Sequence, residues 1–174
     1  MVFTEQLKDY INSYKDFPKE GIVFRDFLPI FQKPDLYKEL IQRMSQNNIW
    51  KEIDAIIAID ARGFLVGSSI SLELNKPLIV ARKPGKLPGQ IIEKSYNLEY
   101  GNNKLCIQES AISPFNKFVI VDDLLATGGT AKCVLDILNI KKKEILALSV
   151  VLELAFLQGA KNIGIPIHSE VKYY

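Results

Sequence analysis

The chain has 174 residues, 48% of them hydrophobic and 24% charged, and a formal net charge of +2. These values are typical of one soluble globular domain with a sizeable core, and a small net charge without a basic stripe argues against a nucleic-acid partner. No apolar run approaches the roughly 20 residues of a membrane span, and the first 14 residues lack a signal-peptide core, so we expect a cytoplasmic protein with no membrane partner.

Three side chains that often bind metals give no such signal here. Cys106 and Cys133 lack the spacing of metal ligands, so we expect reduced thiols. The single histidine, His168, is expected to be structural.

The N-terminal part predicts two helices separated by an extended segment. Leu7, Tyr10, Ile11 and Tyr14 repeat at helical spacing and predict a helix over about residues 4–14. An extended piece is expected over 22–27. Pro34 and Asp35 suit the first turn of the next helix.

The next stretch alternates strand and helix. A strand is expected over 53–59, a helix over 65–74 and a second strand over 77–81. The turn at 60–64 contains Arg62, whose guanidinium can bind a phosphate through two hydrogen bonds.

Residues 82–108 read as a loop and a hairpin. Two prolines and two glycines in 82–89 prevent regular structure, and the cations Arg82, Lys83 and Lys86 make this segment suitable as an anion-binding lid. Alternation of apolar residues turns Glu99 to the other side of its strand. A turn at 101–103 and a partner strand over 104–108 complete the predicted hairpin.

The most informative stretch runs from Phe118 to Thr130. Four apolar residues, 118–121, are typical of a strand buried on both faces of a parallel sheet, and Asp122 and Asp123 follow them. A loop of small residues comes next, and then helical spacing at Ala131, Val134, Leu135 and Leu138. Ligands bind at the carboxyl ends of such strands.

The residue types of this loop predict a ribose 5-phosphate site. Gly128 and Gly129 allow an anion to come close to the backbone, and the N–H groups at the helix start favour a phosphate. The carboxylates of Asp122 and Asp123 repel a phosphate but accept hydrogen bonds from sugar hydroxyls. No lysine follows the glycines, which excludes a Walker A loop.

After this stretch, a buried strand is expected over 145–152 and a short helix over 153–160 that ends at Gly159. The order of elements predicts an α/β fold with a mainly parallel sheet flanked by helices.

Residues 121–130 closely resemble the phosphoribosyl pyrophosphate signature of type I phosphoribosyltransferases, and the form Leu-Leu-Ala-Thr resembles those members that act on adenine. Three further stretches match the family: Pro-x-x-Gly-Ile-x-Phe-Arg-Asp at 18–26, Arg-Lys-x-x-Lys-Leu-Pro-Gly at 82–89 and Ser-Tyr-x-Leu-Glu-Tyr-Gly at 95–101. The resemblance implies one domain over 1–174, with a small N-terminal hood at 1–33 and a flexible lid hairpin at 82–108.

The resemblance also implies an activity. It is the transfer of ribose 5-phosphate from 5-phosphoribosyl 1-pyrophosphate to N9 of adenine, which forms AMP and pyrophosphate in purine salvage. Mg²⁺ is expected, held mainly by the substrate and not by direct protein ligands, because a hard cation neutralises the pyrophosphate leaving group. A homodimer is expected from the family.

The same resemblance implies roles for individual residues. Catalysis is assigned to Glu99, Asp122 and Asp123. The ribose and the 5′-phosphate are assigned to Asp122, Asp123, Ala126, Thr127, Gly128, Gly129 and Thr130. The pyrophosphate is assigned to Arg62, Arg82, Lys83 and Lys86, and adenine to Val23, Phe24, Arg25, Leu125 and Ala126.

Two alternatives remain open at this point. The first is a phosphoribosyltransferase for another purine base. The 6-oxopurine enzymes of this superfamily place a lysine after the following strand, and residues 150–155 contain none. The second is a non-catalytic sensor of phosphoribosyl pyrophosphate or nucleotides with the same fold. The lid cations and Glu99 argue against it, because a sensor needs no general acid.

Overall fold

The computed structural model describes residues 3–98 and 101–174, and the chain forms two compact units, Met1–Arg43 and Met44–Tyr174. The first unit contains α1 (Phe3–Lys8), β1 (Asn12–Lys15), β2 (Val23–Asp26), the short 3-10 helix η1 (Leu28–Gln32) and α2 (Pro34–Met44), whose last residue belongs to the second unit. Leu7, Phe27, Ile30 and Leu40 are fully buried.

The first unit corrects one predicted helix. The helix expected over 4–14 ends at Lys8, and Asn12–Lys15 instead pairs antiparallel with Val23–Asp26. The connecting loop is closed by a hydrogen bond from the Gly21 N–H to the Asp16 carboxylate, at 2.8 Å, and both residues have positive φ. This turn brings the two strands together, and their pairing replaces the last helical turns.

The second unit holds the remaining elements. They are η2 (Asn48–Lys51), β3 (Ala55–Ile59), α3 (Gly63–Leu74), β4 (Leu78–Ala81), β5 (Ile91–Leu98), β6 (Gly101–Gln108), α4 (Glu109–Ile112), β7 (Lys117–Leu125), α5 (Gly129–Ile140), β8 (Glu144–Leu154), η3 (Ala155–Leu157), α6 (Gly159–Ile163) and β9 (Ile167–Tyr173). None of the helices in the described ranges is both long and apolar enough to cross a membrane.

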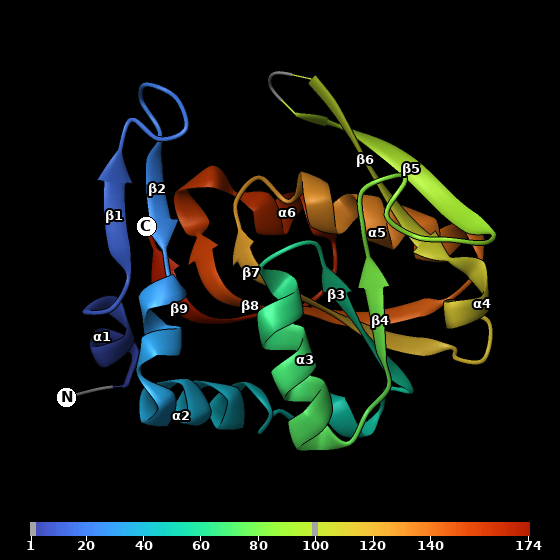
Figure 1. Cartoon of the computed structure of the whole chain (residues 1–174), viewed down its shortest axis with the longest axis horizontal. Coiled ribbons are helices and arrows are strands. Elements are labelled where there is room, and N and C mark those ends of the chain that lie inside the picture. The colour runs from blue at the N-terminus through green and yellow to red at the C-terminus, as the bar shows by residue number, and fades with distance from the viewer. Residues whose placement is uncertain (1–2, 99–100) are drawn as a thin grey trace. The chain divides into compact units, whose positions relative to one another are not determined.

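A five-stranded sheet with the order β4-β3-β7-β8-β9 forms the centre of this unit, and every neighbouring pair is parallel (Figure 1). All five residues of β3 are buried, as are Phe118–Val121 of β7, because helices cover the sheet. The predicted α/β fold is confirmed.

The chain leaves the middle of the sheet in two directions. The connection through α3 leads from β3 to β4 at one edge, and the connection through α5 leads from β7 to β8 on the other side. Right-handed crossovers in opposite directions place the two helices on opposite faces. The carboxyl ends of β3 and β7 therefore flank a topological switch point, where open α/β sheets bind ligands.

The hairpin of β5 and β6 is longer than predicted. Ile91–Leu98 pairs antiparallel with Gly101–Gln108, so Gly101–Asn103 belongs to a strand and the turn predicted there is wrong. The base of the hairpin joins the core, since Leu105 and Ile107 are buried and Cys133 Sγ contacts the Lys94 carbonyl at 3.2 Å.

The C-terminal part also differs from the prediction. Glu153 and Leu154 extend β8 instead of starting a helix, and α6 begins at Gly159, where the predicted helix ends. The last strand, β9, pairs along β8 from Leu148 to Leu154 and so keeps these residues in the sheet.

Candidate functional site

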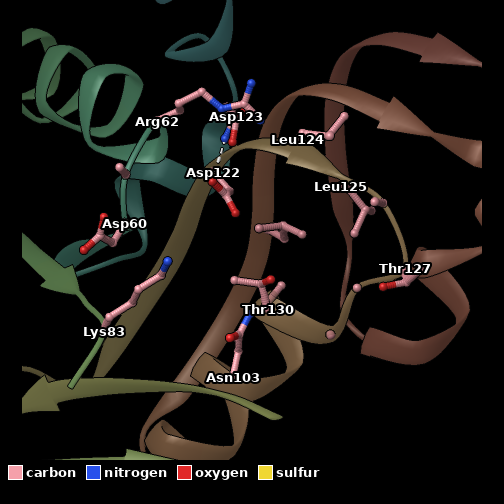
Figure 2. A pocket seen from close by; sticks show the side chains of 16 residues that line it. Asp60, Arg62, Lys83, Asn103, Asp122, Asp123, Leu124, Leu125, Thr127 and Thr130 are labelled. Carbon is pink, nitrogen blue, oxygen red and sulfur yellow. Dashed lines mark hydrogen bonds and ion pairs between the residues drawn. The ribbon is translucent and has the colours of Figure 1, made fainter. Parts of the chain in front are cut away.

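A cavity of about 430 Å³ lies at the carboxyl ends of β3 and β7, entirely within the second unit (Figure 2). Residues from five parts of the chain line it: Asp60, Ala61 and Arg62 after β3, Lys83 after β4, Asn103 on β6, Asp122–Ala131 from β7 into α5, and Leu148 on β8. The cavity therefore combines the acidic pair, the glycine loop and two cations.

The loop of residues 126–130 comprises the connection from β7 to α5 and the first two residues of α5, and its conformation depends on Gly128. Its φ of 84° is a left-handed conformation that glycine adopts without strain, and it is the residue before the first turn of α5. The backbone N–H groups at the start of an α-helix favour an anion. Thr127, Gly128, Gly129 and Thr130 line the cavity at this helix start, and this arrangement suits an anion site.

The acidic pair, Asp122 and Asp123, lies within β7 and directly follows the buried run 118–121. Asp123 is 6% exposed, and its carboxylate lies 2.8 Å from the Arg62 guanidinium, toward which it points in Figure 2. The start of α3 is close to this pair, because a Cβ added to Gly63 would lie 2.8 Å from Asp122 Oδ1. A glycine at 63 thus lets the turn after β3 bring Arg62 to Asp123.

Asp122 sits in a different electrostatic environment. Burial raises the pKa of its carboxyl well above 3.8, and the neighbouring charge of Asp123 raises it further. The Asp123 N–H, which donates to Asp122 Oδ1 at 2.8 Å, and the charge of Arg62 oppose these effects only in part. The surroundings of Asp122 therefore favour the protonated form of its carboxyl.

Arg82 is held at the edge of the site by Asp60. Its Nε lies 3.1 Å from Asp60 Oδ2, and its guanidinium lies over the Phe64 ring at 5.6 Å from the centroid. Asp60 follows β3 and lines the cavity, whereas Arg82 is absent from the described lining. An ion pair thus links the predicted lid to the turn that carries Arg62.

Only one lid lysine lines the cavity among the described residues. Lys83 is exposed and extends its amine toward the cavity that Asp122 also faces (Figure 2). Lys86 is exposed and outside the described lining, and its N–H bonds to the Lys83 carbonyl in a turn.

The structure brings most, but not all, of the predicted site residues together. Arg62, Lys83, Asp122, Asp123 and Leu125–Thr130 line one cavity. Val23, Phe24 and Arg25 belong to β2 in the first unit, where Phe24 packs edge-on against Phe17 and Arg25 bonds to Ser13. Glu99 lies outside the described residues, so its predicted role stays a prediction.

Sequence reasoning missed two polar residues of the cavity. Asp60 directly follows a parallel strand, a position at which ligand-binding residues are common, and this signal was available. Asn103 was assigned to a turn, and its place in the cavity depends on the register that pairs it with Tyr96. Within the described residues, no group of three or more His, Cys, Asp or Glu side chains forms a candidate metal site.

Comparison with known proteins gives a consistent result. The family model of the phosphoribosyl transferase domain matches residues 30–163. The adenine phosphoribosyltransferase of Prochlorococcus marinus strain AS9601 is 54% identical over 167 residues, which cover 96% of this chain and 98% of the relative. That of Halothermothrix orenii is 42% identical and covers 91% of this chain and 93% of the relative.

Solved structures of adenine phosphoribosyltransferases are also similar to this chain. The adenine phosphoribosyltransferase of Saccharomyces cerevisiae, complexed with an imino-altritol bisphosphate and adenine, superposes with a TM-score of 0.90 at 36% identity, covering 97% of this chain and 98% of that chain. The enzyme of Thermoanaerobacter pseudethanolicus gives a TM-score of 0.92 at 35% identity, covering 98% of this chain and 99% of that chain.

Proposed function

The chain belongs to the phosphoribosyl transferase family, and we infer that it transfers ribose 5-phosphate from 5-phosphoribosyl 1-pyrophosphate to adenine, forming AMP and pyrophosphate. The observation that carries this conclusion is the cavity at the switch point of the sheet. Its lining combines the loop of residues 126–130 with the carboxyl groups of Asp122 and Asp123, and this combination supports binding of a sugar that carries a phosphate.

The roles of the cavity residues follow from their chemistry. The loop from Ala126 to Thr130 binds the 5′-phosphate through backbone N–H groups and the hydroxyls of Thr127 and Thr130. Asp122 and Asp123 accept hydrogen bonds from the ribose hydroxyls. As the bond from C1′ to the pyrophosphate oxygen breaks, positive charge develops on the ribose, and these carboxylates stabilise it.

The pyrophosphate leaves toward the cations. Arg62 and Lys83 line the cavity and receive its negative charge first. Arg82 and Lys86 belong to the segment that leads into the β5–β6 hairpin and contribute when that segment closes. Since Leu105 and Ile107 at the base of the hairpin are buried, we propose that the movement of the lid excludes this base.

Adenine is proposed to lie next to Leu125 and Ala126, two apolar residues of the cavity lining. Val23, Phe24 and Arg25 of the first unit are proposed as further adenine contacts on the basis of the family stretch at 18–26. A backbone carbonyl in that segment would accept a hydrogen bond from the 6-amino group. The end of β8, residues 150–154, offers no lysine for a 6-oxo group, which supports adenine over hypoxanthine or guanine.

Glu99 is proposed as the general acid that donates a hydrogen bond to N7 while N9 attacks C1′, and the proton of N9 is taken up by the departing pyrophosphate. An ordinary glutamate is ionised at pH 7. Closure of the lid over pyrophosphate would raise its pKa by desolvation and by like charge.

Mg²⁺ is proposed as the cofactor, bound mainly by the phosphate oxygens of the substrate. Two of the cavity carboxylates, Asp60 and Asp123, already pair with Arg82 and Arg62, which leaves few oxygens to hold a cation without substrate. When bound, Mg²⁺ neutralises charge on the leaving group.

A homodimer in the cytoplasm is also proposed. Leu65 and Leu72 on α3 and Leu78 on β4 are exposed apolar side chains, suited to a contact between copies. Cys106 and Cys133 are free thiols, as is usual in a reducing compartment.

A turnover assay tests the proposed function. The protein is incubated with 5-phosphoribosyl 1-pyrophosphate and, separately, adenine, hypoxanthine, guanine, xanthine or orotate, with Mg²⁺ or with a chelator. We expect AMP from adenine in the presence of Mg²⁺. Product from another base only would assign a different substrate, and binding without any product would favour the sensor.

A further inference from the structure

The phosphate loop lies directly against the start of α6. A Cβ added to Gly159 would lie 2.1 Å from the carbonyl oxygen of Ala126 and 2.9 Å from the amide nitrogen of Gly128. The contact is reciprocal, because a Cβ added to Gly128 would lie 2.7 Å from the Gly159 carbonyl oxygen. Both contacts are with backbone atoms, so a side chain at either position displaces the loop.

The same helix holds the loop by a hydrogen bond. Asn162 Nδ2 donates to the Thr127 carbonyl oxygen at 3.0 Å. The C=O of Thr127 and the N–H of Gly128 belong to one planar trans peptide and point in opposite directions. Fixing the carbonyl on Asn162 therefore also fixes the direction of the Gly128 N–H.

We propose that Gly159 and Asn162 are positioning residues, which hold the loop of residues 126–130 in the conformation that binds the 5′-phosphate. Neither residue is part of the described cavity lining, so both act through the loop and not on the substrate. The proposal rests on the proposed function, because it assumes that this loop receives the 5′-phosphate.

If Gly159 and Asn162 serve only folding, their substitution weakens the binding of all ligands to a similar extent. If they position the loop, their substitution weakens only the ligand that the loop binds. Two ligands separate these cases. Ribose 5-phosphate carries the group that the loop binds, and pyrophosphate with Mg²⁺ occupies the side of Arg62 and Lys83. Isothermal titration calorimetry on the full chain measures both affinities.

The first variant is Asn162→Leu, which removes the donor while keeping a similar size at an exposed position. Loss of one hydrogen bond predicts roughly two- to tenfold weaker binding of ribose 5-phosphate and pyrophosphate binding within twofold of wild type. Lys161→Ala is the matched control. Lys161 is exposed on the same helix and bonds to Gln158, at 3.0 Å, so we expect wild-type affinity for both ligands.

The second variant is Gly159→Ala. Alanine favours a helix more than glycine does, so an effect on α6 alone would be neutral or stabilising. The contact with the Ala126 carbonyl predicts the opposite, a loss of ribose 5-phosphate affinity greater than that of Asn162→Leu.

The outcomes are distinct. Selective loss of ribose 5-phosphate binding in Asn162→Leu supports the proposal. Equal loss of both ligands, or wild-type binding of both, overturns it while leaving the proposed function intact. Failure of the wild-type protein to bind ribose 5-phosphate would contradict the proposed function and this inference together.

Discussion

The Arg62 guanidinium lies 2.8 Å from the Asp123 carboxylate, so a cation assigned to pyrophosphate pairs with an anion assigned to ribose. The pair connects the turn before α3 with β7, on the two sides of the switch point. A substrate with a pyrophosphate at C1′ and hydroxyls on the ribose offers each partner a replacement. Binding then exchanges one ion pair for two charge-assisted hydrogen bonds.

Arg62→Ala should raise the KM for 5-phosphoribosyl 1-pyrophosphate and lower the free energy of unfolding. Asp123 is 6% exposed and would lose its cation, which costs about 1–3 kcal/mol for a buried polar group. Adding Asp123→Asn should restore part of the stability but none of the activity. Urea unfolding and initial rates measure the two effects. A folded Arg62→Ala variant with an unchanged KM would remove Arg62 from the pyrophosphate site.

Asp122 predicts a pH dependence of stability. Its pKa is raised in the folded protein by burial and by Asp123, so the folded state keeps a proton that the unfolded chain releases above pH 3.8. The raised pKa leaves the free energy of unfolding unchanged below pH 3.8, lowers it as the pH rises toward the pKa of the folded state, and lowers it by a constant amount above that pKa. The difference in the free energy of unfolding between Asp122→Asn and wild type should therefore grow with pH in favour of the variant and then level off. A difference that is constant from pH 4 to 8 in urea unfolding would contradict the raised pKa.

The lid lysines should differ in their contribution to substrate binding. Lys83→Ala should raise the KM for 5-phosphoribosyl 1-pyrophosphate roughly ten- to a hundredfold, the value of one charge-assisted contact, and spare the KM for adenine. Lys86→Ala should raise it less, because Lys86 is outside the described cavity lining. A raised KM for adenine alone in the Lys83 variant would show that the lid serves the other substrate.

Glu99→Ala should lower kcat by roughly 10²–10⁴-fold, the usual contribution of a general acid. Glu99→Gln keeps a hydrogen-bond donor but transfers no proton. A high residual rate for the glutamine variant would mean that hydrogen bonding to N7 is sufficient. If both variants retain kcat within a fewfold of wild type, Glu99 is not the acid.

The spacing of apolar residues was sufficient to predict an element whose own side chains show which face is buried. Ala131, Val134, Leu135 and Leu138 were predicted to share a face of a helix, and all four are buried on α5. The apolar run 118–121 was likewise confirmed as a buried strand at the centre of the sheet. In both cases the burial that stabilises the element is visible in its own residues.

The local pattern of residues gave a wrong prediction where contacts with residues distant in the sequence determine the structure. Glu153 reads as the start of a helix, but its carboxylate accepts from Ser169 at 2.7 Å and pairs with Lys172 at 3.0 Å, and both partners belong to β9. The same limit applies to the site. From the sequence, Arg82 was predicted to bind the pyrophosphate. The ion pair of Arg82 with Asp60 was not predicted, because the two residues are 22 positions apart and meet only in the folded chain.

The most direct test of the ribose site is the rate of AMP formation from adenine and 5-phosphoribosyl 1-pyrophosphate by the double variant Asp122→Asn, Asp123→Asn. Circular dichroism of the same sample establishes that it is folded. Asp136→Asn is the matched control, since Asp136 is an exposed carboxylate on α5 that pairs with Lys132 outside the described lining. We predict a folded double variant with almost no turnover beside a control with the wild-type rate. A folded double variant with near-normal kcat/KM would contradict the account.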